Sequence, residues 1–209
     1  VATDLDIIFY DVISDVKIIN EGSTTTSAAI LYDILRKISS NSELIFQLKT
    51  ENKLSLKSDN SDFNLLCLPT DNFPTFDNNF DGQQMTLNSQ KFLNLLNKTK
   101  ISISNDDTRH YLNGIFLHLT EGQGRVFLTA VATDSHRLSS SSIELENENN
   151  INPVILPKKA VFQLCTLLAD NKDKLELQIS ENKIKFNIGN ISLISKVIDG
   201  KFPDYEKVV

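Results

Sequence analysis

The four residues "VATD" occur twice in this chain, at 1–4 and again at 131–134. The same offset of 130 positions aligns other segments without gaps. "AAILYDILRKI" (28–38) and "KKAVFQLCTLL" (158–168) share apolar residues at the i, i+1, i+4, i+5, i+8 spacing of an amphipathic helix. Because several segments recur at one offset, the sequence indicates a duplicated module.

Strand patterns recur at this offset as well. "NKLSLK" (52–57) and "NKIKFN" (182–187) both alternate apolar and polar residues, as half-buried strands do. With a slip of one residue, "DNFPTF" (71–76) aligns with "DGKFPDY" (199–205), so Phe73-Pro74 recurs as Phe202-Pro203. These matches support the same duplication.

The two copies of "VATD" lead into different residues. We interpret "VATD" as a strand end shared by both copies. In the first copy, "LDIIF" (5–9) is predicted to continue as an alternating strand. In the second, "SHRLS" (135–139) turns polar and basic. The point of divergence is therefore the first candidate for a functional site.

The second copy is the more complete one and begins near Met85. A helix within 85–99 could be capped by Asn88 or Ser89. Strands are predicted at 114–120, 124–133 and 139–146, then a polar loop at 147–153, a helix within 156–168 and further strands. Each module thus has two strand–helix–strands units, an α+β class with short helices on one face of antiparallel sheets. By the offset, the first module would begin about 45 residues before Val1, so we expect a fragment.

Composition sets broad limits on the class of protein. The chain is 40% hydrophobic and 23% charged, as globular proteins are. Its net charge of −6 argues against a strongly basic nucleic-acid binder, although an acidic protein can carry a basic face. We find neither a run near the ~20 apolar residues of a membrane span nor a signal peptide. A cytoplasmic location and no membrane association are expected.

Four segments together resemble the bacterial DNA sliding clamps, the beta subunits of DNA polymerase III. They are "VATDSHRLS" (131–139), "RHYLNG" (109–114), "ILYDILRKI" (30–38) and "DGKFPDYEKV" (199–208). The resemblance implies three modules per subunit, with antiparallel sheets outside and short helices inside. It also implies a homodimer that closes head to tail around duplex DNA. Residues 1–81 would be the latter part of the first module and 82–209 the central one, and the third would be absent.

The resemblance implies a non-catalytic processivity factor without cofactor or metal. Its partners would be duplex DNA, the replicative DNA polymerase alpha subunit, the clamp loader and repair proteins. Sliding requires weak phosphate contacts from an inner wall of helices. The DNA-facing candidates are Arg36, Lys37, Lys91, Lys98, Lys100, Arg109, His110, Tyr111, Lys158 and Lys159. Any single lysine is equally an ordinary solvated residue, and Asp106 and Asp107 weaken the case for the loop 104–114.

The resemblance also implies a pocket for short peptide motifs of partner proteins. Its matching positions are Leu112, Thr133, Ser135, His136, Arg137, Leu138, Pro203 and Val208. The apolar members would form a slot, and the polar ones would hydrogen-bond the peptide. The family often has Gly where Ser135 stands, so this side chain would narrow the rim. The third module would supply part of the pocket.

Other functional classes have less support in the residues. Asp134, Ser135 and His136 could suggest a hydrolase, but neighbours on an extended strand end point to opposite faces, and no Gly-x-Ser-x-Gly elbow surrounds Ser135. A metal site from His110, His118 and His136 lacks paired spacing. A duplicated protein-interaction scaffold without DNA encirclement is compatible with the composition.

Overall fold

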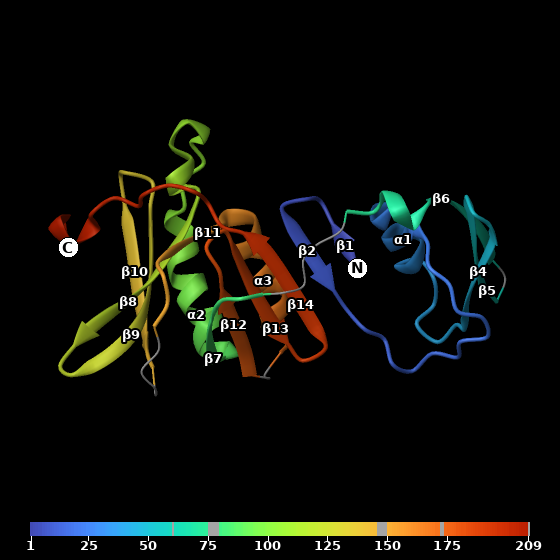
Figure 1. Ribbon diagram of the computed structural model, residues 1–209, viewed down its shortest axis with the longest axis horizontal. Helices are drawn as coiled ribbons and strands as arrows, with labels where there is room; N and C mark the ends of the chain where they lie inside the picture. The colour runs from blue at the N-terminus through green and yellow to red at the C-terminus, as the bar shows by residue number, and fades with distance from the viewer. Residues whose placement is uncertain (60, 75–79, 146–149, 172–173, 209) are drawn as a thin grey trace. The chain divides into compact units, whose positions relative to one another are not determined.

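The computed structural model (Figure 1) describes residues 1–59, 61–74, 80–145, 150–171 and 174–208. The chain forms two compact units, a larger one of Val1–Val12 with Asn79–Val209 and a smaller one of Ile13–Asn78. Residues 1–12 belong to the larger unit because strand β2 (Ile7–Tyr10) pairs with β14 (Ile191–Lys196). The domain boundary expected between residues 81 and 82 stays a prediction.

The larger unit repeats the order strand, helix, three strands. The first set is β7 (Gln83–Asn88), α2 (Ser89–Thr99), β8 (Gly114–Gly122), β9 (Arg125–Thr133) and β10 (Leu138–Glu144). The second is β11 (Val154–Pro157), α3 (Lys158–Ala169), β12 (Lys174–Ile179), β13 (Lys183–Ile188) and β14. This confirms the predicted strand–helix–strands units. Residues 146–149 lie outside the described residues; they include the end of the predicted strand 139–146 and part of the predicted loop 147–153.

Two sheets form the larger unit, and all their strand pairs are antiparallel. One has the order β1-β2-β14-β13-β12-β7, where β1 is Ala2–Thr3, and the other has the order β10-β9-β8-β11. Strand β7 therefore pairs with β12 of the second set, and β11 pairs with β8 of the first. Each set donates its leading strand to the other set's sheet, so neither can complete its sheet alone.

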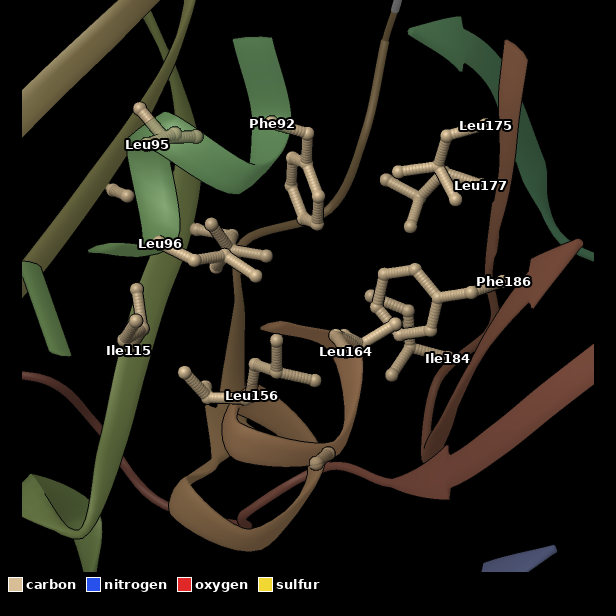
Figure 2. Packing of buried hydrophobic residues seen from close by; sticks show 14 of the residues in the cluster. Phe92, Leu95, Leu96, Ile115, Leu156, Leu164, Leu175, Leu177, Ile184 and Phe186 are labelled. Carbon is tan, nitrogen blue, oxygen red and sulfur yellow. The ribbon is translucent and has the colours of Figure 1, made fainter. Parts of the chain in front are cut away.

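The main apolar core joins these sheets to helices α2 and α3. Figure 2 shows Phe92 and Leu96 of α2 and Leu164 of α3 directed toward Leu177 and Phe186 of the six-stranded sheet. The rings of Phe92 and Phe186 lie 6.0 Å apart between centroids. Alternation along β13 turns Ile184, Phe186 and Ile188 inward, as a strand with one buried face requires.

Helix α2 starts where its sequence allows a cap. The Asn88 side chain accepts a hydrogen bond from the backbone N–H of Lys91 at 3.0 Å, which selects Asn88 over Ser89 as the N-cap. The helix has 11 residues and α3 has 12. Of the helices in the described ranges, none combines the length and apolar character that a membrane crossing requires.

The smaller unit repeats the second half of the larger one. It contains β3 (Thr25–Thr26), α1 (Ala28–Leu35), β4 (Leu44–Thr50), β5 (Lys53–Ser58) and β6 (Ser61–Leu68), in one sheet of order β3-β6-β5-β4. The elements α1, β4, β5 and β6 each start 130 positions before α3, β12, β13 and β14, which confirms the duplication. All eight residues of α1 are described, and none of them is buried. Leu31 and Ile34 of this helix pack, partly buried, against a small apolar cluster of the sheet.

The predicted continuation of the first "VATD" as one strand over 5–9 is wrong. Strand β1 ends at Thr3, and the chain turns before β2 starts at Ile7. The Thr3 hydroxyl oxygen accepts from the N–H of Leu5 at 3.0 Å, and an Asp4 carboxylate oxygen accepts from that of Ile7 at 2.9 Å. Leu5 takes a left-handed φ of 78° to close this turn. Side-chain capping by Thr and Asp thus overrides the alternating pattern.

Candidate functional site

The second "VATD" forms the same turn between β9 and β10. The Thr133 hydroxyl accepts from the N–H of Ser135 at 3.1 Å and donates to the carbonyl of Arg137 at 2.8 Å. One oxygen of Asp134 accepts from the N–H groups of His136 and Arg137, both at 3.0 Å. Ser135 has a φ of 76°, close to that of Leu5. The backbone repeat therefore extends through the turn, and the two copies differ here in side chains.

Asp134 acts as the structural anchor of this turn. Hydrogen bonds from the N–H groups of His136 and Arg137 hold the pKa of its carboxyl below the ordinary value. Its second oxygen accepts from Nε of Arg137 at 3.0 Å. The side chains of Ser135, His136 and Arg137 are left exposed on the rim of the turn.

The loop that was predicted to face DNA lies against this turn. Arg109, in the 3₁₀ segment Asp107–Leu112, donates from Nη1 to the Ser135 hydroxyl at 2.6 Å. Its Nε donates to Asp106 at 2.9 Å, so one arginine ties the acidic start of the loop to the turn. Sequence spacing gave no sign of this contact, because the two residues are 26 positions apart.

An apolar cluster lies behind the turn and the loop. Leu112, Val131, Ile155 and Phe202 form its buried part, and Tyr111, Phe116, Leu138, Ile198 and Tyr205 pack on it partly buried. The cluster brings together Leu112 and Leu138 of the predicted pocket. Leu112 is itself buried, so it supports the surface from beneath, whereas Leu138 and Tyr111 are partly open to solvent. Pro203 is exposed beside Phe202, and Val208 is 76% exposed.

Aromatic contacts attach the segment that carries Pro203 and Val208. Phe202 stacks on Phe116 with 4.9 Å between ring centroids and 6° between planes. Phe116 in turn stacks on His118 at 4.7 Å. The final 3₁₀ segment, Tyr205–Val208, is then held by a 2.8 Å hydrogen bond between the Tyr205 hydroxyl and Nε2 of His118.

His118 has a defined tautomer at this position. Its Nδ1 lies 3.0 Å from the carbonyl oxygen of Leu119, which can only accept, so Nδ1 carries the proton and Nε2 accepts from Tyr205. Burial lowers the pKa of His118, and burial likewise raises the pKa of the Tyr205 hydroxyl, so both groups are neutral near pH 7. Sequence reasoning considered His118 only in a metal site that it set aside, and missed this role. The available signal was the i, i+2 spacing of Phe116 and His118, which places both on one face of β8.

The remaining DNA-facing candidates fall in separate places. Arg36 and Lys37 follow α1 in the smaller unit, with the Arg36 guanidinium 5.8 Å from the Tyr32 ring centre. In the larger unit Lys91 lies in the first turn of α2, Lys98 in its last turn, and Lys100 directly after it. Lys158 and Lys159 open α3.

The lysines at the end of α2 and the start of α3 contact polar side chains, and two of them also contact one aromatic ring. Lys100 donates to Asn97 at 2.6 Å, Lys158 donates to Asn105, and Lys159 pairs with Asp4. The Lys159 contact, aided by the N–H of Ile7, lowers the pKa of Asp4 to about 2. Both Lys100 and Lys158 also lie over the ring of Phe162. His110, by contrast, contacts the carbonyl oxygen of Asp199 at 3.1 Å, at the start of the segment that carries Pro203.

Two family models match this chain in order along the sequence. The model of the DNA polymerase III beta subunit N-terminal domain matches residues 1–77, and that of the central domain matches 86–204. The beta sliding clamp of Caulobacter vibrioides is 34% identical over 210 residues, 100% of this chain and 56% of that protein. The beta sliding clamp of Escherichia coli K12 is 35% identical over 90% of this chain and 50% of that protein.

Solved structures show the same similarity. A sliding clamp from Bartonella birtlesii, a DNA polymerase III subunit beta solved bound to griselimycin, is 36% identical with a TM-score of 0.92. A Caulobacter crescentus beta sliding clamp is 34% identical with a TM-score of 0.94. Each match covers 100% of this chain and 56% of the solved chain. The chain therefore spans about half the length of the relatives that it matches.

Proposed function

The chain belongs to the DNA polymerase III beta subunit family, and on this premise we propose that it serves in a DNA sliding clamp. The observation that carries the proposal is the ordered match to two successive clamp domains, together with a fold that follows solved clamps along the entire chain. In this role the protein encircles duplex DNA as a homodimer and keeps the replicative polymerase on its template. Its contribution is topological and non-catalytic, and it works in the cytoplasm.

The contact with DNA is proposed to be electrostatic and independent of sequence. In a chain of net charge −6, the lysines around α2 and α3 supply local positive charge for phosphates. Such contacts weaken with salt, while a closed ring stays on DNA for topological reasons. A protein of the relatives' full length that contains this chain is loaded on circular duplex DNA and washed with high salt. We expect retention that is lost when the circle is cut; release from intact circles would favour the scaffold without encirclement.

A peptide-binding pocket is proposed beside the turn between β9 and β10. The exposed polar side chains of Ser135, His136 and Arg137 adjoin the partly open Leu138 and its apolar cluster, so apolar and hydrogen-bonding groups lie together. The partners proposed for this pocket are peptide motifs of the DNA polymerase alpha subunit, the clamp loader and repair proteins. Arg109 and Tyr111 are proposed to serve this pocket as well, because Arg109 contacts Ser135 and Tyr111 packs on the same cluster.

The pocket is tested by titrating a clamp-binding peptide, and separately griselimycin, into isotope-labelled protein. We expect amide chemical-shift changes at His136, Arg137 and Leu138. Leu138→Ala removes a central apolar anchor and should weaken binding by about tenfold. Ile143→Ala, in the same strand but packed on the main core, is the matched control and should leave affinity unchanged. Shifts confined to other surfaces, or equal effects of the two substitutions, would remove the pocket assignment.

A further inference from the structure

Helix α3 exposes a large aromatic ring in a charged setting. Its inward face is filled by Ala160, Val161, Leu164 and Leu168, all fully buried. Phe162 lies outside this face and is 45% exposed. The core of the larger unit is therefore complete without the Phe162 ring, and its position calls for another explanation.

Two cations flank the Phe162 ring. The Nζ atom of Lys100, after α2, lies 5.5 Å from the ring centroid, and that of Lys158, in the first turn of α3, lies 5.9 Å from it. The ring and the ammonium groups attract each other, which holds both lysines over the ring. Positive charge and a flat apolar surface thus stand together on two neighbouring helix ends.

A shallow cavity of about 480 Å³, open to solvent, has the Phe162 ring in its lining. One water molecule occupies roughly 30 Å³ in the liquid, so the cavity has room for a planar heterocycle. The amides of Asn105 and Gln163 line it together with Lys158, and Asp107 lies at the same cavity. Side-chain amides both donate and accept hydrogen bonds, as the polar edge of a nucleobase does.

We propose that Phe162, Lys100 and Lys158 form a binding site for an unpaired nucleotide of single-stranded DNA. The base displaces the ammonium groups from the Phe162 ring, stacks on it and enters the cavity, and the displaced lysines contact the flanking phosphates. Duplex DNA offers the lysines its phosphates, but its bases remain stacked inside the helix and cannot reach the ring. The site would therefore add a preference for single-stranded DNA at primer–template junctions to the proposed clamp function, on which this inference rests.

The test compares binding of a fluorescent oligothymidylate and a duplex of equal length to the chain at low salt. Phe162→Leu keeps an apolar side chain but removes the ring, and should weaken binding of the single strand about tenfold with little change for the duplex. Lys158→Gln should weaken both ligands, because it removes a phosphate contact. Tyr32→Leu is the matched control, since Tyr32 is also an exposed helical aromatic beside a cation. It should leave single-strand affinity unchanged.

A direct contact provides the second readout. Nuclear Overhauser effects between the Phe162 ring protons and thymine protons are expected in the single-strand complex. Equal weakening of both ligands by Phe162→Leu, absence of these effects, or no single-strand binding by the unmodified chain would overturn the proposal. Retention of the full-length protein on circular DNA would still stand in that case, so failure of this site and failure of the clamp function are distinguishable.

Discussion

Phe202 is expected to hold in place the segment that carries Pro203 and Val208 of the proposed pocket. It is 6% exposed and lies parallel to Phe116, in a segment, residues 199–208, whose described residues form no strand. Truncating a buried phenylalanine to alanine costs about 3–5 kcal/mol, and the lower value suits a site near the surface. Phe202 is not part of the main core. We therefore expect Phe202→Ala to lower the free energy needed to detach this segment locally by about 3 kcal/mol, while the larger unit stays folded.

Amide hydrogen exchange measures this local opening. The N–H of Ile198 donates to the carbonyl of Ile155 at 2.9 Å, where the segment joins the unit. A loss of about 3 kcal/mol corresponds to exchange roughly 100-fold faster at Ile198. The amide of Phe186 in β13 should be unchanged, and Phe202→Leu should have a smaller effect. Peptide affinity should fall with Phe202→Ala. Unchanged exchange at Ile198, or equal acceleration at Phe186, would refute the local role.

Three further outcomes concern stability. Leu164→Ala should lower the free energy of unfolding by about 2–5 kcal/mol in urea titrations followed by circular dichroism, whereas Leu66→Ala, at a side chain 86% exposed, should stay within about 0.5 kcal/mol. Asp4 has a folded pKa of about 2, below its ordinary 3.8, so its contribution is present above pH 4 and lost as the pH falls toward 2. Because its side chain is 43% exposed, this is worth less than about 1 kcal/mol, and Asp4→Asn should make the fall of the melting temperature over that pH range smaller. Leu5→Gly should raise the melting temperature by relieving up to about 1 kcal/mol of left-handed strain, and Leu5→Ala should not.

Local patterns in the sequence predicted much of the fold. The helices α2 and α3, the alternation along β13 and a cap at Asn88 or Ser89 all depend on residues within a few positions of one another, and spacing records such interactions. The 130-residue offset is equally visible, because duplication copies whole elements. By contrast, the turn after Asp4 was missed because capping by side-chain oxygens is a geometric event that an apolar pattern does not report.

The candidate site was only partly accessible to sequence reasoning. The turn residues from Ser135 to Leu138 stood out because the two copies differ there. The contact of Arg109 with Ser135 and the His118–Tyr205 hydrogen bond were not foreseeable, since 26 and 87 positions separate the partners. Nothing in local spacing says which distant side chains meet.

The sequence alone determined the module, its repeat and the place where the copies diverge. The tertiary structure decided how the halves join: β7 pairs with β12, and β11 with β8, so each strand–helix–strands set completes the sheet of the other. Register and partner choice in antiparallel sheets depend on which apolar faces find each other across the whole fold, and every strand pattern here permits several partners. The same long-range packing brings the 109–112 loop, the 133–138 turn and the 199–208 segment onto one apolar cluster.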